Sequence, residues 1–254
     1  MPGSGAVTRN TLRRQIADAL RDEVLAGRLP AGREFTVKQI AEQYEVSATP
    51  VREALVDLSA QGLLESVEHR GFRVKVFTVE DFRGMIEARK LVADGIFRLL
   101  VERGTGPGCG ERLVSVRRRA EEAQRAAESG SLEVLIGYDL RFWRELGELL
   151  GNVYISEFLH RIRVQCWVFA VPHLQREPQL RTRLWYGHTR LLDAVTRGDA
   201  EAARLLVQEY NQSGLDWAAQ LQDAGAVPGS GPGSGPKVRP GAGRGVRSGV
   251  RPEA

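Results

Sequence analysis

The polar side chains best placed to bind another molecule lie in one string, Ser47-Ala48-Thr49-Pro50-Val51-Arg52-Glu53-Ala54-Leu55. Ser47 or Thr49 can cap a helix and Pro50 suits its first turn, so a helix is predicted over about 48–61. On that helix Arg52 faces outward, where it can bind a phosphate or the edge of a guanine. The outer face also holds Thr49 and Val56, and the inner face holds Val51, Ala54, Leu55 and Leu58. The string therefore predicts a helix that enters the major groove of DNA.

Neighbouring segments complete a DNA-binding motif around this helix. A short helix predicted over 37–44, with Lys38 at its beginning, precedes the string across a tight turn. The pair forms a helix-turn-helix. Two β-type runs at 63–67 and 72–77 follow, joined by Glu68-His69-Arg70-Gly71, and predict a two-stranded wing with a basic tip. The residues predicted to contact DNA are Lys38, Ser47, Ala48, Thr49, Arg52, His69, Arg70, Gly71 and Arg73.

The chain divides into two folded parts with a segment at each end. A flexible lead-in at 1–8 precedes a winged helix-turn-helix domain at 9–77, whose first helix is predicted over 10–26. An all-helical part follows at 78–223, capped at its beginning by Thr78 and interrupted by a glycine-rich break at 104–110. Its helices are predicted over 79–103, 111–129, 132–151, 153–170, 178–197 and 199–222, with Pro172 and Pro178 bracketing a loop. Short connections predict an antiparallel bundle, so the fold class is mostly α.

Composition and charge restrict the class of protein. The net charge of +4 resides in a Gly/Pro/Ser-rich tail at 224–254, which is predicted to be disordered. The basic pI is therefore no argument that the folded body binds DNA, although the tail can add about five phosphate contacts. No apolar run reaches the roughly 18 residues that span a membrane, and no signal peptide begins the chain. The two cysteines, Cys109 and Cys166, lack metal-site spacing, so a cytoplasmic protein is expected.

Several motifs of residues 10–77 resemble the winged-helix domain of the GntR family of bacterial transcription regulators. They are Leu29-Pro30-Ala31-Gly32, Ile40-Ala41-Glu42, Val46-Ser47, Thr49-Pro50-Val51-Arg52-Glu53-Ala54-Leu55, Gly62-Leu63-Leu64-Glu65 and Arg70-Gly71. The helical remainder resembles the FadR/FCD branch of that family. The resemblance implies a homodimer that binds a palindromic operator in double-stranded DNA, as a repressor. One departure is Ala48, which stands where the family usually has a base-reading arginine, so we expect an altered operator.

Polar residues interrupt the apolar stripes of the helical part. Arg89, Asp139 and His188 each occupy an inward position of a predicted helix, and Tyr210 shares a face with Leu206 and Trp217. A buried charge is costly unless it is paired, so these residues predict a ligand pocket. The structural alternatives are an Arg89–Asp139 ion pair and a His188 that is satisfied within the core.

The FCD resemblance also implies a divalent metal site of one aspartate and three histidines. Asp139 and His188 match two of these positions, but Trp143 and Tyr210 occupy the other two and are poor ligands. We therefore expect no Zn²⁺ or Ni²⁺ cofactor. Trp143 is expected to fill part of the site, with Asp139, His188 and Tyr210 in one hydrogen-bonded cluster. Arg89 is expected to bind an anionic effector, such as a small carboxylate.

The function predicted from these features is an effector-controlled transcription regulator. Binding in the helical part would alter the spacing or order of two winged domains and so weaken DNA binding. The alternative is an interaction or dimerisation protein without an effector. An enzyme is not expected, because the chain has no His-Glu-x-x-His motif, phosphate-binding loop or nucleophile elbow.

Overall fold

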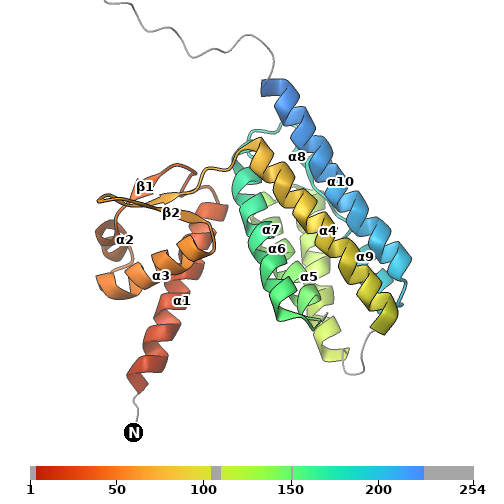
Figure 1. Cartoon of the computed structure of the whole chain (residues 1–254), viewed down its shortest axis with the longest axis horizontal. Helices are drawn as coiled ribbons and strands as arrows, with labels where there is room; N and C mark the ends of the chain where they lie inside the picture. The colour runs from red at the N-terminus through yellow and green to blue at the C-terminus, as the bar shows by residue number, and fades with distance from the viewer. Residues whose placement is uncertain (1–3, 104–109, 150, 226–254) are drawn as a thin grey trace, which may run out of the picture.

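Three helices and a small sheet form the N-terminal part of the molecule, coloured red to orange in Figure 1. The computed structural model describes residues 4–103, 110–149 and 151–225. The helices are α1 (Ser4–Leu25), α2 (Val37–Gln43) and α3 (Ala48–Ala60), and the strands are β1 (Glu34–Phe35), β2 (Leu64–Val67) and β3 (Gly71–Val74). We call residues 4–77 the winged domain.

The helices of the winged domain follow the predicted pattern except at the beginning of the first. Helix α1 begins at Ser4 rather than at Asn10, so a flexible lead-in is wrong for residues 4–8. The physical reason is that no proline interrupts the chain between Ser4 and Leu25. Helices α2 and α3 agree with their predicted ranges to within one residue. Residues 1–3 lie outside the described residues.

The wing has three strands rather than two. Strand β1 pairs antiparallel with β3 in the order β1-β3-β2, with Phe35 opposite Phe72. The buried ring of Phe35 anchors this added strand in the core. Gly71 makes the close approach possible, because its φ is +114° and a Cβ there would lie 2.4 Å from the carbonyl oxygen of Phe35. The predicted two-stranded hairpin missed β1 because a two-residue strand is too short to show an alternating pattern.

The remaining helices form the helical domain, residues 78–225. They are α4 (Val79–Arg103), α5 (Gly110–Ser129), α6 (Leu132–Glu148), α7 (Val153–Leu174), α8 (Leu180–Arg183), α9 (His188–Thr196) and α10 (Ala200–Gly225). Thr78 caps α4 as predicted, since its Oγ1 accepts a hydrogen bond from the backbone N–H of Asp81 at 3.1 Å. Residues 104–109 of the predicted break at 104–110, with Cys109, and the tail from 226 lie outside the described residues, whereas Gly110 begins α5.

Two predicted boundaries in this domain are wrong. The helix predicted over 178–197 is two helices. Leu184 takes an extended conformation (φ −89°, ψ 132°) that ends α8, and α9 begins only after its N-cap residue, Gly187. Helix α7 continues through Pro172 to Leu174, so no loop begins at that proline. The buried side chains of Val171 and Leu174 extend its apolar face past the proline. The described residues of this domain therefore contain seven helices, where six were predicted.

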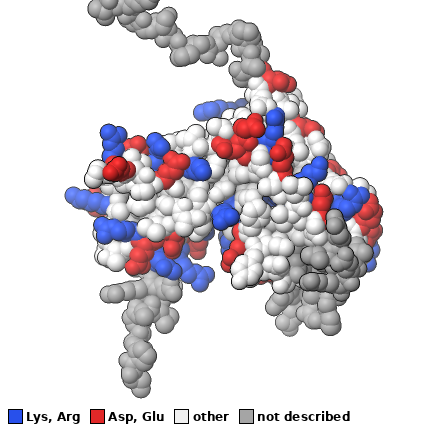
Figure 2. All heavy atoms as spheres, viewed as in Figure 1, with Lys and Arg blue, Asp and Glu red and all other residues white. Residues whose placement is uncertain are grey.

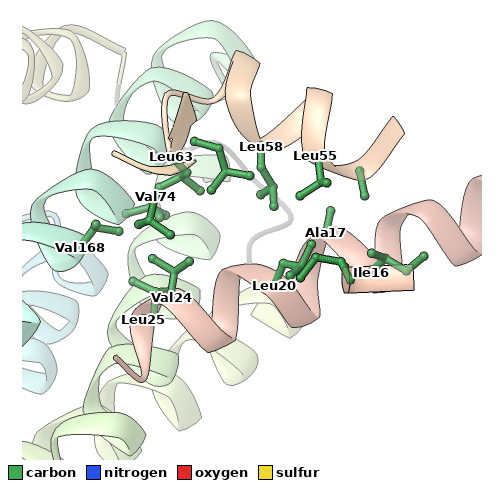
Figure 3. Close-up of a cluster of buried hydrophobic side chains, with 14 of the residues drawn as sticks. Ile16, Ala17, Leu20, Val24, Leu25, Leu55, Leu58, Leu63, Val74 and Val168 are labelled. Carbon is green, nitrogen blue, oxygen red and sulfur yellow. The ribbon is translucent and has the colours of Figure 1, made fainter. Parts of the chain in front are cut away.

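The two domains share one hydrophobic core. In Figure 1, α6 and α7 lie on the side of the bundle next to the winged domain, whereas α4 and α10 run side by side on the far side. Figure 3 shows Val168 of α7 beside Val74 and close to Val24 and Leu25 of α1. The same cluster includes Ile136 and Leu140 of α6 and Val164 and Val171 of α7. The winged domain is thus packed directly against two helices of the bundle.

Polar contacts support this packing. The side-chain Nε2 of Gln165 donates to the backbone carbonyl oxygen of Gln61 at 2.8 Å. The side-chain Nε2 of Gln175 donates to the backbone carbonyl oxygen of Ala26 at 3.3 Å. Gln165 lies in α7 and Gln175 is its C-cap residue, and each bonds to the residue directly after a winged-domain helix. Within the described residues, no helix has the length and apolar character needed to cross a membrane.

Candidate nucleic-acid interface and ligand cavity

Helix α3 divides into a buried face and an open face, as its sequence predicts. Val51, Ala54 and Leu55 are fully buried and Leu58 is 1% exposed. Thr49 and Arg52 are exposed, and Val56 is 54% exposed. The capping prediction is wrong in detail, because Ser47 holds the N-cap position but its side chain makes no capping hydrogen bond. The open face of α3 is therefore free to meet another surface.

Six of the predicted DNA-contacting residues surround one shallow hollow. It lies between the beginning of α2, the beginning of α3 and the turn of the wing, and its lining includes Lys38, Ala48, Arg52, His69, Arg70 and Gly71. The side chains of Lys38 and His69 are 84% and 91% exposed. Figure 2 shows blue Lys and Arg side chains along the outer edge of the winged domain, at the left. Basic side chains from three separate segments thus open onto one face.

The other predicted residues are placed differently. Ser47 and Thr49 are exposed at the beginning of α3 but do not line the hollow. Arg73 lies on β3, where its Nη2 donates to Glu65 at 2.8 Å. That hydrogen bond raises the pKa of the Arg73 guanidinium. Arg73 would have to leave this pair to bind a phosphate. The sequence reading did not anticipate that two acidic residues, Glu42 and Glu45, would line the hollow.

A cavity of about 300 Å³ lies inside the helical domain. Its walls come from α4, α6, α7, α8 and α10 and from the segment between α8 and α9. Three of the residues predicted to bind an effector, Arg89, Asp139 and Tyr210, line it. Trp143 and His188 do not line it but bind Asp139 directly. The structure therefore gathers all five predicted residues in one place.

Asp139 is the buried centre of a hydrogen-bond network. It is 2% exposed, and its Oδ1 accepts from the indole Nε1 of Trp143 at 2.9 Å and lies 3.0 Å from Nε2 of His188. Its Oδ2 accepts from Nε1 of Trp167 at 2.9 Å. Burial by itself would raise the pKa of Asp139, but the hydrogen bond and charge of His188 and the charge of Arg163 together lower it. The carboxylate is held in its ionised form.

The residues present do not fit a divalent metal. Among the described residues, no group of three or more His, Cys, Asp or Glu side chains is arranged to hold one. The carboxylate oxygens of Asp139 face N–H donors instead, and an indole ring at Trp143 offers no lone pair. The ring of Trp143 stacks on that of Tyr210 with 5.3 Å between centroids, so the two non-ligand positions pack against each other.

Arg89 contacts two neutral side chains of α10. It is 4% exposed, and its Nε donates to Oδ1 of Asn211 at 2.8 Å. Its Nη1 donates to the hydroxyl of Tyr210 at 3.3 Å. The alternative of an Arg89–Asp139 ion pair is therefore wrong, and Tyr210 joins the arginine rather than the cluster of Asp139 and His188. These contacts arise because α4 and α10 pack side by side along their length.

Arg163 is the functional candidate that sequence reasoning missed. It is 4% exposed, lines the cavity, and holds its guanidinium 3.9 Å from the centre of the Trp143 ring. Burial lowers the pKa of this guanidinium. The available signal was an arginine between two buried apolar residues, Ile162 and Val164, in the helix with the longest apolar stretches. Trp167 lies one turn further along α7. It was not predicted because it stands between Cys166 and Val168, where nothing in the sequence distinguishes it from an ordinary core residue.

Comparisons with known proteins agree with the arrangement of both domains. A family model described as bacterial regulatory proteins, gntR family, matches residues 12–74, and a model of the FCD domain matches residues 84–213. A probable D-xylose utilization operon transcriptional repressor of Paenarthrobacter nicotinovorans is 28% identical over 227 residues, which cover 85% of this chain and 97% of that protein. The transcriptional regulator McbR of Escherichia coli (strain K12) is 26% identical over 221 residues, covering 85% and 96%.

A solved structure shares the fold. The structure of E. coli McbR/YncC matches with a TM-score of 0.67 and 24% identity, covering 83% of this chain and 98% of that one. Both curated relatives are named as transcription regulators, which points away from an enzyme.

Proposed function

Because the chain belongs to the GntR family of bacterial regulatory proteins and its helical domain is an FCD domain, we propose that it represses transcription by binding a palindromic operator as a homodimer. An effector that enters the cavity of the helical domain weakens this binding. The observation that carries the proposal is that two helices, α6 and α7, contribute side chains both to the cavity and to the contact with the winged domain.

The DNA contacts are assigned to the open face of α3, the beginning of α2 and the tip of the wing. Arg52 has the position and the charge to bind a phosphate or a guanine, and Lys38 and Arg70 flank it across the hollow. Replacing Arg52 by alanine is expected to remove one such contact, which is worth about 1–3 kcal/mol if it reads a base. A second winged domain in the dimer would present the same surface to a second half-site.

The path from effector to DNA runs across α7. Arg163, Trp167 and Leu174 line the cavity, whereas Val164, Val168 and Val171 pack into the core shared with the winged domain. Because an α-helix turns by about 100° per residue, the two sets are adjacent stripes on one helix. A rotation of α7 that accommodates a ligand therefore moves the surface on which the winged domain rests.

Helix α6 has the same two-sided character. Leu135 and Asp139 line the cavity, and their immediate neighbours Ile136 and Leu140 belong to the shared core. On α6, as on α7, residues that line the cavity are thus directly followed in sequence by residues of the shared core. The coupling thus has two parallel routes, and neither needs a flexible linker to carry it.

Selection of randomised duplex DNA with the purified full chain tests the proposal. Enrichment of a palindrome, together with a dimer in sedimentation experiments at the same protein concentration, is the expected result. An Arg52→Ala variant should lose this enrichment, whereas Arg73→Ala should retain it, because Arg73 is paired with Glu65. A folded wild type that enriches no sequence would contradict the proposal and favour an interaction protein that does not read DNA.

A further inference from the structure

Two buried arginines line the cavity of the helical domain without an acidic partner. Arg89 and Arg163 are each 4% exposed. In the part of the chain that the structure describes, neither guanidinium forms a salt bridge. Arg89 is held by the neutral side chains of Asn211 and Tyr210. A buried guanidinium costs free energy unless an anion neutralises it, so a negative charge in this cavity would be stabilised.

Arg163 is the less satisfied of the two. Its guanidinium rests on the ring of Trp143, and its Nε is buried without a hydrogen-bond partner among the described residues. Burial lowers its pKa even though a hydrogen bond with Tyr210 and the charge of Asp139 act in the opposite direction. A buried N–H that finds no acceptor is expensive, and a ligand oxygen would satisfy it.

The carboxylate of Asp139 lines the same cavity but is already used. Its two oxygens accept hydrogen bonds from the indoles of Trp143 and Trp167, and His188 lies within hydrogen-bond distance. It therefore has little capacity left to neutralise two guanidinium groups. The other carboxylate that lines the cavity, Asp216, is exposed and accepts a hydrogen bond from Gln212, so we assign the negative charge that would balance Arg89 and Arg163 to a ligand.

Aromatic side chains form much of the remaining wall. Trp185 and Tyr210 lie with their ring centres 4.9 Å apart, and Phe82 and Trp217 lie 5.6 Å apart in a T-shaped pair. All four line the cavity. The indole Nε1 of Trp185 is buried and has no partner within the described residues, which leaves a second N–H donor for a ligand. Aromatic walls favour a ring that can stack on them or meet their edges.

The size of the cavity restricts its occupant further. Its volume of about 300 Å³ is at the lower end of the range for ligand sites, roughly 300–1,000 Å³. This space suits one or two rings and a short acidic side chain better than a sugar phosphate or a nucleotide.

We propose that this cavity binds a small aromatic carboxylate, with the carboxylate between Arg89 and Arg163 and the ring against Trp185 and Tyr210. The two arginines supply the positive charge that a divalent metal would otherwise bring to such a site. That the ligand acts as the effector rests on the proposed function, whereas its binding to the cavity does not.

Calorimetric titration of the full chain with benzoate, phenylacetate and indole-3-acetate tests this inference. At least one of the three should bind at least tenfold more tightly than its uncharged amide and at least tenfold more tightly than acetate. Tryptophan fluorescence should change on binding, because Trp167, Trp185 and Trp217 line the cavity. Equal affinity for the acid and its amide would refute the requirement for a negative charge. Equal affinity for the aromatic acid and acetate would refute the requirement for an aromatic ring. Absence of binding by all three acids at millimolar concentration would overturn the proposal as a whole.

Two arginine variants on α7 locate the site. Arg163→Met removes the buried charge, keeps much of the side-chain volume, and should weaken binding of the tightest acid at least tenfold. Arg161→Met is the matched control, since Arg161 is an exposed arginine two residues away on the same helix. The affinity of the Arg161→Met variant for the same acid should stay within twofold of the wild type. Arg89→Met provides a second test if Arg163→Met does not fold. Unchanged affinity in a folded Arg163→Met or Arg89→Met variant would place the ligand elsewhere.

DNA binding separates this inference from the proposed function. If an aromatic acid binds the cavity but does not release the operator, the assignment of the site stands and its role as effector is wrong. If a non-aromatic metabolite releases the operator while no aromatic acid binds, the proposed function stands and this inference is wrong.

Discussion

The indole Nε1 of Trp143 donates to Oδ1 of Asp139 from one turn further along the same helix, at 2.9 Å. Trp143 occupies a position where the FCD resemblance implies a metal-binding histidine. Its side chain offers the carboxylate an N–H donor instead of a lone pair for a metal ion. The carboxylate remains buried and ionised, because indole donors and His188 take the place of a cation. A site that resembles a metal centre in sequence is thus an aromatic hydrogen-bond network in structure.

Restoring two ligands should restore metal binding. We expect the double variant Trp143→His and Tyr210→His to bind Zn²⁺, because it again offers one aspartate and three histidines at the family's ligand positions. Zinc at about 100 times its Kd should then stabilise the variant by about 2.7 kcal/mol, measured by thermal unfolding. Trp143→Phe is the control, which removes the indole donor without adding a ligand. A double variant that folds but gains no stability from zinc would show that the backbone no longer suits the metal.

Restoring an arginine at position 48 should change which operator is preferred. Ala48 lies exposed at the beginning of α3 and lines the hollow, but its methyl group can at most contact a thymine methyl. In Ala48→Arg, a bidentate contact to guanine should add about 1–3 kcal/mol of discrimination at one base pair in each half-site. Competition binding with matched duplexes that differ at that base measures it. The same ranking of duplexes for both proteins would refute the assignment of this position.

The partly buried histidine between the domains predicts a loss of stability in mild acid. Burial, with the charges of Arg144 and Arg21, lowers the pKa of His160 to about 3. The unfolded chain, with a histidine pKa of about 6.5, binds this proton first, so stability is full above pH 6.5 and falls as the pH drops toward 3. Between pH 7 and pH 5 the loss is about 2 kcal/mol in the free energy of unfolding.

The variant His160→Gln isolates this effect. It cannot titrate, so the free energy of unfolding measured by urea denaturation should fall less from pH 7 to pH 5 than in the wild type. Parallel pH profiles for the two proteins would show that another group causes the acid sensitivity.

Two glycines provide opposite tests of the fold. In Gly71→Ala, the new Cβ would lie 2.4 Å from the carbonyl oxygen of Phe35 at a φ of +114°, so we expect a loss of about 1–3 kcal/mol. Gly84 lies in α4, where a Cβ would meet no atom of the described residues within 4 Å. Gly84→Ala should therefore stabilise the protein by about 0.4–1 kcal/mol. Urea unfolding of both variants measures the difference, and equal effects would refute the strain at the wing.

The winged domain was largely predictable because its signals are local. The inward positions of α3 follow from a spacing of three and four residues, and its turns follow from glycine and proline. Strand β1 was not predictable, because Phe35 becomes a strand residue only through its pairing with β3. That pairing is made by residues far apart in the sequence.

Three residues that line the cavity, Arg89, Asp139 and Tyr210, were predicted from the sequence, whereas Arg163, Trp167 and most of the contacts were not. Asp139 and His188 could be identified as polar residues on apolar faces, and the structure joins them. The side-chain partners of Arg89 were not predictable, because the choice among Asp139, Asn211 and Tyr210 depends on how α4 and α10 pack. The position of Trp185 depends on the extended residue Leu184, which interrupts a sequence that otherwise reads as one helix.

Helix α7 both lines the cavity and supports the winged domain, which restricts the substitutions that this protein can accept. No layer of side chains separates the ligand cavity from the support of the winged domain, since Arg163 and Val164 are consecutive residues. A substitution that retunes the cavity for a new ligand will therefore also alter operator affinity in the absence of any ligand. A genetic screen for constitutive regulators should find its mutations concentrated in α6 and α7, and changes of ligand specificity there should require compensating changes in α1.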